Sequence, residues 1–286
     1  MISHWIYATR PKTLPVSVCP VLFSFFIANK TVPISWITAL CIVMCVLCIQ
    51  IGTNFANDYY DFVKGADTHD RVGPQRMTQS GNIPENQMKW AAFFMFALAI
   101  FFGGYLVFVG GIPIVLIGLS AIFFGFIYTA GPFALAYIGG AEFISLLFFG
   151  PISVIGTTYL LTLKWDWSLW PIGIAFGLIT AALLVVNNTR DIDSDKQVNK
   201  KTLAVRFGRL FSTVEYVLFL YIPIIILDIF TQDSVEQIIL TLLLVFVAMI
   251  LTRRFGQASG IDFNRLLALT SVYLILFTLI STYLMQ

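Results

Sequence analysis

The chain alternates long apolar stretches with short polar segments. About 18 or more consecutive apolar residues suffice to cross a bilayer as a helix. On this criterion the pattern predicts nine spans, at roughly 13–29, 34–56, 89–109, 112–129, 136–160, 167–188, 214–231, 235–252 and 263–284. Before the first span, Trp5, Ile6 and Tyr7 lie next to charged residues and favour a short segment at the membrane interface. The sequence therefore predicts an all-α, polytopic membrane protein built as a helical bundle.

Composition supports this class. The 286 residues are 58% hydrophobic and only 11% charged, whereas a soluble domain carries about 25% charged residues. The net charge of +2 is too small to suggest a nucleic-acid partner. Cys41, Cys45 and Cys48 form one stripe of the second span, and we interpret them as small packing residues.

The basic residues predict an orientation. If the nine spans are correct, all of the 17 Lys and Arg residues except Lys30 and Lys164 lie on the same side as the N-terminus. Basic loops remain in the cytoplasm. We therefore expect a protein of the cytoplasmic (inner) membrane, with its N-terminus inside the cell and its C-terminus outside.

Two clusters of Asn and Asp are the main candidates for chemistry. The first cluster covers residues 54–67 and the second covers residues 187–195. Residues four apart share a helix face, which groups Asn57 with Asp61 and groups Asn187 with Asp191 and Asp195. Grouped carboxylates repel unless a cation binds them, and oxygen ligands suit Mg²⁺ bound to substrate phosphates. The predicted metal ligands are Asn57, Asp61, Asp67, Asp191 and Asp195.

The placement of the clusters indicates an internal duplication. Each cluster begins where an even-numbered span ends, the second or the sixth, and continues into a polar loop, about 57–88 or 189–213. Both clusters fall on the predicted cytoplasmic side. We expect one domain, 1–286, with pseudo-repeats of about 1–130 and 131–260 plus a final helix, and a site at the axis that the repeats share.

Other residues near the clusters suit a diphosphate site. Basic side chains clamp diphosphate oxygens, although the positive-inside rule alone also explains a basic loop. Glu142 is an acid within an apolar stretch, which favours either function or an interhelical hydrogen bond. Tyr59, Tyr60 and Tyr128 are candidates to face a carbocation. The predicted substrate-binding residues are Asn54, Asp58, Lys64, Arg71, Arg76, Tyr128, Glu142, Asn187, Asn188, Arg190, Lys200 and Lys201.

Two function classes fit these observations. A secondary transporter also has repeats and intramembrane acids, but its broken helices place them at the bilayer midplane. Here the acids gather at the ends of spans, which favours an enzyme that acts at the membrane surface.

Several segments carry a family resemblance. They are residues 10–15 (RPKTLP), 57–67 (NDYYDFVKGAD), 71–76 (RVGPQR), 128–132 (YTAGP), 148–151 (FFGP) and 187–206. In these the chain resembles the UbiA superfamily of intramembrane aromatic prenyltransferases, over nearly its whole length. The superfamily pattern NDxxDxxxD is altered, since Asp67 rather than residue 65 supplies the third acid. That spacing is similar to the branch that uses dihydroxynaphthoate.

The resemblance implies a nine-helix bundle around a central cavity that the two polar loops cap. It implies Mg²⁺, a polyprenyl diphosphate and an aromatic acid as partners, with Asn57, Asp61, Asp191 and Asp195 as catalytic residues. The implied reaction prenylates 1,4-dihydroxy-2-naphthoate with loss of CO₂ and diphosphate, giving a demethylmenaquinone in menaquinone biosynthesis. Acceptors such as 4-hydroxybenzoate, homogentisate or a glycerol phosphate stay open, as do the prenyl chain length and the oligomeric state.

Overall fold

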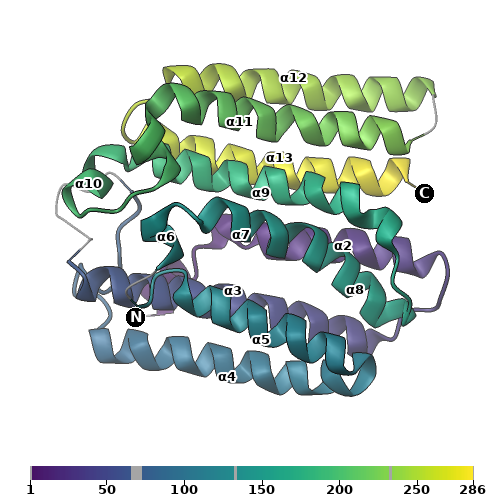
Figure 1. Ribbon diagram of the computed structural model, residues 1–286, viewed down its shortest axis with the longest axis horizontal. Coiled ribbons are helices and arrows are strands. Elements are labelled where there is room, and N and C mark those ends of the chain that lie inside the picture. Colours follow the sequence, from purple (N-terminus) through teal and green to yellow (C-terminus); the bar gives the residue numbers. More distant parts are fainter. Residues whose placement is uncertain (1, 66–72, 132–133, 232–233, 286) are drawn as a thin grey trace.

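The described residues form a bundle of helices that run side by side (Figure 1). The computed structural model describes residues 2–65, 73–131, 134–231 and 234–285, and no strand occurs in these ranges. The elements are α1 (Ile2–Ala8), η1 (Pro11–Thr13), α2 (Pro15–Asn29), α3 (Trp36–Val63), α4 (Glu85–Gly110), α5 (Ile112–Ile127), α6 (Leu135–Ile138), α7 (Ala141–Leu147), η2 (Phe148–Ile152), α8 (Ser153–Thr162), η3 (Trp167–Leu169), α9 (Trp170–Arg190), α10 (Ile192–Gln197), α11 (Leu203–Phe230), α12 (Val235–Gln257) and α13 (Asp262–Leu284).

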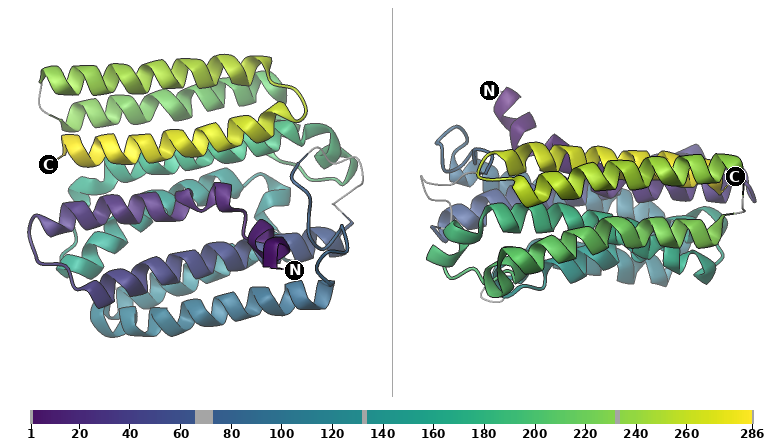
Figure 2. Two further views of the ribbon diagram at one scale, coloured as in Figure 1. Left: turned by 180° about the vertical axis from the view of Figure 1, so that it is seen from behind. Right: turned by 90° about the horizontal axis from the view of Figure 1, so that it is seen from above.

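The all-α membrane fold is confirmed. Within the described residues, 7 helices are long and apolar enough to cross a membrane, or 8 if the bent N-terminal pair forms one span. That pair joins residues 2–13 to α2 at an angle of 58°, and α1 projects from the bundle (Figure 2, right). The apolar helix α5 has only 16 residues and is not counted among these spans. The count therefore agrees approximately with the nine predicted spans.

Local sequence explains where several spans begin. The side chains of Ser35, Thr202 and Ser234 accept hydrogen bonds from the backbone of Thr38, Val205 and Gln237, at the starts of α3, α11 and α12. Such caps satisfy amide groups that lack a partner within the helix.

Both predicted polar loops were too long. Helix α3 continues to Val63, α4 starts at Glu85, and α11 starts at Leu203, so the predicted loops 57–88 and 189–213 were wrong at these boundaries. Hydropathy detects only the apolar middle of a spanning helix. In α3 the helix continues because its polar residues are buried and bonded. In α11 the added turn ends at Gly208, whose φ of 78° breaks the helix.

The predicted span 136–160 corresponds to the candidate span Ala141–Thr162, but the helix within that span is interrupted. Gly150 has a non-helical backbone inside η2, and Pro151 follows it. The break packs closely on α9: a Cβ at Gly150 would lie 2.6 Å from the carbonyl oxygen of Gly173, and one at Gly177 would lie 2.2 Å from that of Leu146. These distances leave no room for a side chain. The segment η2 itself contains no charged residue.

Helix α9 forms the centre of the core. Of the 18-residue apolar stretch in the span that contains α9, 78% of the residues are buried, whereas the corresponding share is 22% in α4 and in α12. Ile172, Phe176 and Ile179 of α9 belong to the same buried cluster as Tyr216 of α11 and Phe277 of α13. The second cluster of Asn and Asp therefore sits at the end of the most firmly packed helix.

Candidate active site

One cavity of about 600 Å³ lies between the N-terminal segment and helices α2, α3, α5, α7 and α9. Its lining changes along two helices. On α3 it runs from Val46 and Ile49 to Asp58, and along α9 it runs from Thr180 and Leu183 to Asp191, which caps the helix. The cavity therefore has an apolar part within the bundle and a polar part where α3 and α9 end.

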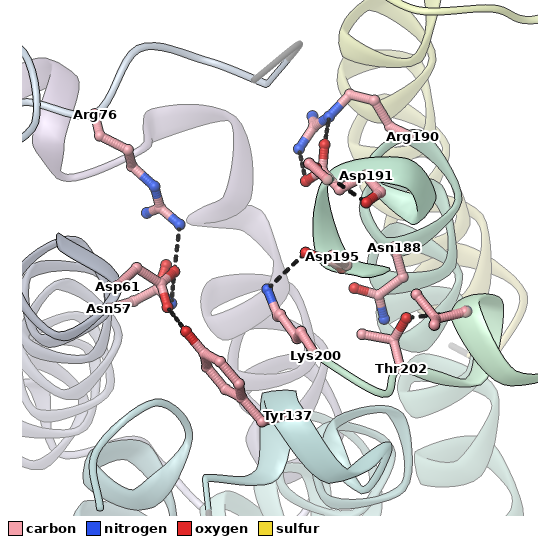
Figure 3. A network of polar contacts seen from close by, with 12 residues as sticks. Asn57, Asp61, Arg76, Tyr137, Asn188, Arg190, Asp191, Asp195, Lys200 and Thr202 are labelled. Carbon is pink, nitrogen blue, oxygen red and sulfur yellow. Dashed lines mark hydrogen bonds and ion pairs between the residues drawn. The ribbon is translucent and has the colours of Figure 1, made fainter. Parts of the chain in front are cut away.

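Asp61 is the centre of the first cluster. It is 2% exposed, and its carboxylate accepts hydrogen bonds from Asn57 Nδ2 (3.0 Å), Arg76 Nη2 (2.9 Å) and the Tyr137 hydroxyl (3.0 Å). The guanidinium of Arg10 donates to Asn57 Oδ1. Residues from the N-terminal segment, α3, the loop after α3 and α6 thus converge on one carboxylate and one amide. Figure 3 shows Asn57, Arg76 and Tyr137 around Asp61.

Asn54 and Asp58 also line the cavity, but both hold neighbouring backbone. Asp58 accepts from the amides of Met77 (3.1 Å) and Thr78 (3.0 Å), which fixes the loop that carries Arg76. Asn54 Nδ2 donates to the carbonyl oxygen of Thr9 at 2.9 Å. These two residues shape the cavity walls.

The second cluster is paired with cations in the same way. Arg190 donates from Nε and Nη2 to the two oxygens of Asp191, at 2.7 Å each, and from Nη1 to Asn264 Oδ1 at 2.7 Å. Lys200 Nζ lies 3.5 Å from Asp195 Oδ1. Figure 3 shows the two clusters facing each other, with Tyr137 and Lys200 between them.

Lys64 connects α3 with the segment after α5. Its ammonium donates to the carbonyl oxygens of Thr129 (2.6 Å) and Gly131 (3.0 Å) and lies 4.4 Å from the centre of the Tyr137 ring. Burial lowers the pKa of Lys64 below its usual value, and the charge of nearby Asp61 opposes this shift. Lys64 therefore links the end of α3 to residues 129–131 beside the cavity.

The structure brings most predicted residues to one place. The predicted site residues that line the cavity are Asn54, Asn57, Asp58, Arg76, Tyr128, Asn187, Asn188, Arg190, Asp191 and Lys200. Asp61, Asp195 and Glu142 are buried and bonded to residues of this lining. Lys64 contacts Thr129, Gly131 and Tyr137 beside the cavity, and Lys201 is exposed. The predicted residues Asp67 and Arg71 lie outside the described ranges.

Two of the tyrosine predictions do not fit. Among the described residues that line the cavity, Tyr128 is present whereas Tyr59 and Tyr60 are absent. Tyr60 packs on Phe126 and Tyr59 lies under Lys89, so both belong to the contact between α3 and its neighbours. Tyrosines at successive helix positions point away from the face that carries Asn57 and Asp61.

Sequence reasoning missed three residues of the site. Arg10 belongs to segment 10–15, which carries part of the family resemblance and could have marked it as a site residue. The sequence interpretation used Arg10 only as a positive charge for the orientation. Tyr137 stands in an apolar stretch, and Asn264 lies at the start of the last predicted span, next to Arg265. Both reach the clusters through the tertiary fold, so no local pattern marked them.

The donor set fits a divalent cation that arrives with a phosphate ligand. In the described part of the chain, no three His, Cys, Asp or Glu side chains lie close enough to hold a metal ion by themselves. Mg²⁺ usually binds one or two carboxylates plus substrate phosphates and waters rather than an all-protein cage. Asn57, Asp61, Asp191 and Asp195 offer the oxygen ligands that this cation prefers.

The chain is similar to known proteins in both sequence and fold. The model of the UbiA prenyltransferase family matches residues 17–268. The 1,4-dihydroxy-2-naphthoate octaprenyltransferase of Mycobacterium tuberculosis strain H37Rv is 34% identical over 206 residues, which cover 72% of this chain and 70% of that protein. The protein of the same name from Escherichia coli strain K12 is 35% identical over 212 residues, covering 72% of this chain and 69% of its own length.

The fold matches solved structures over almost the whole chain. A UbiA homolog from Archaeoglobus fulgidus bound to GPP and Mg²⁺ superimposes with a TM-score of 0.70, at 16% identity and 99% coverage of both chains. The same homolog bound to DMAPP and Mg²⁺ gives a TM-score of 0.69 with 98% coverage of each. The family match and the identity to curated relatives lead to one conclusion: the chain belongs to the UbiA prenyltransferase family and is an integral membrane prenyltransferase.

Proposed function

We propose that this enzyme transfers a polyprenyl group from polyprenyl diphosphate to 1,4-dihydroxy-2-naphthoate, with release of CO₂ and diphosphate and with Mg²⁺ as cofactor. The observation that carries the proposal is one cavity with an apolar interior and a mouth formed by two facing Asn/Asp clusters. A prenyl diphosphate has the same division into an apolar tail and an anionic head. The relatives named above support the naphthoate acceptor.

The three described carboxylates that we predict to bind the metal are each paired with a basic side chain: Asp61 with Arg76, Asp191 with Arg190, and Asp195 with Lys200. With Mg²⁺ bound to these carboxylates, the basic groups would be available to the diphosphate oxygens. The guanidinium fork of Arg190 suits phosphate oxygens as well as it suits a carboxylate. Arg76, Arg190 and Lys200 then stabilise the negative charge that develops on the leaving group.

Asn57, Asp61, Asp191 and Asp195 are the residues that would hold Mg²⁺. Bound there, Mg²⁺ would supply positive charge to the diphosphate as it leaves. Departure of diphosphate with the electron pair of its C–O bond leaves an allylic cation, which the apolar walls around Phe124 and Phe148 keep from water. The naphthoate ring carbon that bears the carboxylate attacks this cation. The carboxylate then leaves as CO₂, and the electron pair of that bond restores the aromatic ring.

We also propose that both clusters face the cytoplasm and that the protein lies in the inner membrane. The support is the basic bias of the segments at the cluster end of the bundle. An aromatic acid made in the cytoplasm then reaches the cavity directly, while the prenyl chain enters from the lipid phase. We further propose that the chain consists of two pseudo-repeats, about 1–130 and 131–260, plus a final helix, and that each repeat contributes one cluster to this end.

A single assay tests the proposal. Purified protein in nanodiscs is given Mg²⁺, a polyprenyl diphosphate and either carboxyl-labelled 1,4-dihydroxy-2-naphthoate or 4-hydroxybenzoate, with products identified by mass. We expect prenylated naphthoquinol and labelled CO₂ in step with diphosphate release. A product that keeps the label, or a preference for 4-hydroxybenzoate, would overturn the acceptor assignment.

A further inference from the structure

A buried acid lies directly behind one wall of the cavity. Asn188 lines the cavity, whereas Glu142 does not, and Asn188 Nδ2 donates to Glu142 Oε1 at 2.5 Å. Glu142 is 4% exposed, and its second oxygen, Oε2, has no hydrogen-bond partner among the described residues. Burying an acid inside an apolar bundle costs free energy, which indicates that Glu142 has a function in the site.

The packing of α7 on α9 fixes this contact. Gly177 of α9 lies so close to α7 that a Cβ there would stand 2.2 Å from the carbonyl oxygen of Leu146. Glu142 opens α7, and Asn188 lies three turns beyond Gly177 on α9. The two side chains are therefore held together by backbone contact between their helices.

The hydrogen bond sets the orientation of the Asn188 amide. Its NH₂ group is turned to Glu142, and Oε1 accepts that bond whether or not the acid carries a proton on Oε2. The amide oxygen is then directed to the other side, toward the space between the two clusters (Figure 3). Oδ1 of Asn188 has no protein hydrogen bond among the described residues, so a hydrogen-bond acceptor is left facing the cavity.

Asn188 also stands at a boundary within the cavity. On α9 the lining residue Leu184 lies one turn before it and Asp191 lies one turn after it. The carbon that receives the prenyl group must lie at this boundary, where the diphosphate site meets the apolar tail site. A diphosphate and a carboxylate present only acceptors to the amide oxygen, whereas the hydroxyl groups of the aromatic acceptor present donors.

We infer that Glu142 is a positioning residue that fixes Asn188 so that its Oδ1 accepts a hydrogen bond from a ring hydroxyl of the aromatic substrate. This inference rests on the proposed function, since it concerns the acceptor of that reaction. Glu142 itself touches Asn188 and stays outside the cavity. It acts on the orientation of the ring and takes no part in bond breaking.

The first test compares an isosteric with an apolar replacement. Glu142→Gln keeps an oxygen that accepts from Asn188, so the KM for the acceptor stays within about threefold of the wild-type value. Glu142→Leu removes the bond and frees the amide to turn, so that KM rises about tenfold or more. The KM for prenyl diphosphate and the Mg²⁺ dependence stay unchanged in both variants.

The second test exchanges the partners. Asn188→Asp places two acids in contact and raises the acceptor KM at least as much as Glu142→Leu does. In the double variant Glu142→Gln with Asn188→Asp, the Gln amide donates to one Asp oxygen and the other oxygen faces the cavity again. The acceptor KM then returns most of the way to the wild-type value. This arm decides the question even if Glu142→Leu fails to fold.

Gln237→Leu provides the matched control. Gln237 is also a buried amide that donates to an acid, Asp228 Oδ1, at 2.8 Å, but neither residue lines the cavity. This variant lowers the melting temperature and leaves the acceptor KM unchanged.

Three results would overturn the inference: equal damage from Glu142→Gln and Glu142→Leu, no recovery in the double variant, or a change in Mg²⁺ dependence in place of the acceptor KM. If wild-type protein prenylates no aromatic acid, the proposed function fails first. If wild-type protein is active and the pattern is missing, only this inference fails.

Discussion

Changing Asp61 to Asn separates the structural role of this residue from its role in the reaction. The replacement keeps the size of the side chain and removes its charge. Arg76, which is 5% exposed, then loses the carboxylate that pairs with it at 2.9 Å. Leaving a buried charge without its partner costs about 3–5 kcal/mol. Arg76 keeps other contacts, so we expect the low end of this range, about 3 kcal/mol.

Two measurements check this prediction. At roughly 2–4 °C per kcal/mol for a chain of this size, the melting temperature in detergent falls by about 6–12 °C. Turnover, measured well below the melting temperature of the variant, falls by a factor of about 10²–10³, as when a preorganised charge is removed from an active site.

The double variant Asp61→Asn with Arg76→Gln distinguishes the two effects. It removes both charges of the pair, so most of the stability returns, but turnover stays low because the carboxylate and the guanidinium are both missing. Asp228→Asn, a change of the same kind away from the cavity, leaves turnover unchanged. If Asp61→Asn retains more than a tenth of the wild-type turnover, the shared site of the two clusters is wrong.

Three further predictions address the cofactor, the packing and the orientation. Excess EDTA stops turnover and added Mg²⁺ restores it, because the clusters offer only oxygen ligands; full turnover in EDTA would refute this. Gly177→Ala places a methyl group against Leu146 and lowers the free energy of unfolding by about 1–3 kcal/mol or more, whereas Gly104→Ala, with open space around it, stabilises α4 by about 0.5–1 kcal/mol. A cysteine at Ser194 is labelled only from the cytoplasmic side and one at Thr231 only from outside, and the opposite pattern would reverse the proposed orientation.

Sequence periodicity predicted the part of the fold that depends on the bilayer. Apolar length located the spans, and helical spacing correctly placed Asn57 and Asp61 on one face, where they share a hydrogen bond. The prediction of two clusters on the same side also follows from the count of spans between them. These features depend on neighbours within one helix or on the thickness of the membrane, so a local pattern carries them.

Features that depend on contacts between helices could not be predicted in this way. Gly150 and Pro151 mark the break locally, but its close packing against Gly173 and Gly177 of α9 is not contained in any pattern of residues 136–160. Tyr137 reaches Asp61 only because α6 turns back over the end of α3. Helix ends were misplaced for a related reason: α3 continues through polar residues because other segments bury and bond them.

The pairing of the clusters also explains why carboxylates alone were an incomplete guide to the site. Repulsion among grouped acids predicted a cation, and the folded chain already supplies three, since Arg76, Arg190 and Lys200 pair with Asp61, Asp191 and Asp195 among the described residues. These pairs let buried acids exist before any substrate arrives. They also place the basic groups within reach of the position where a diphosphate must bind. The cations that stabilise the fold of the empty site are therefore the same groups that the proposed reaction requires, and substituting any one of them is expected to change stability and turnover together.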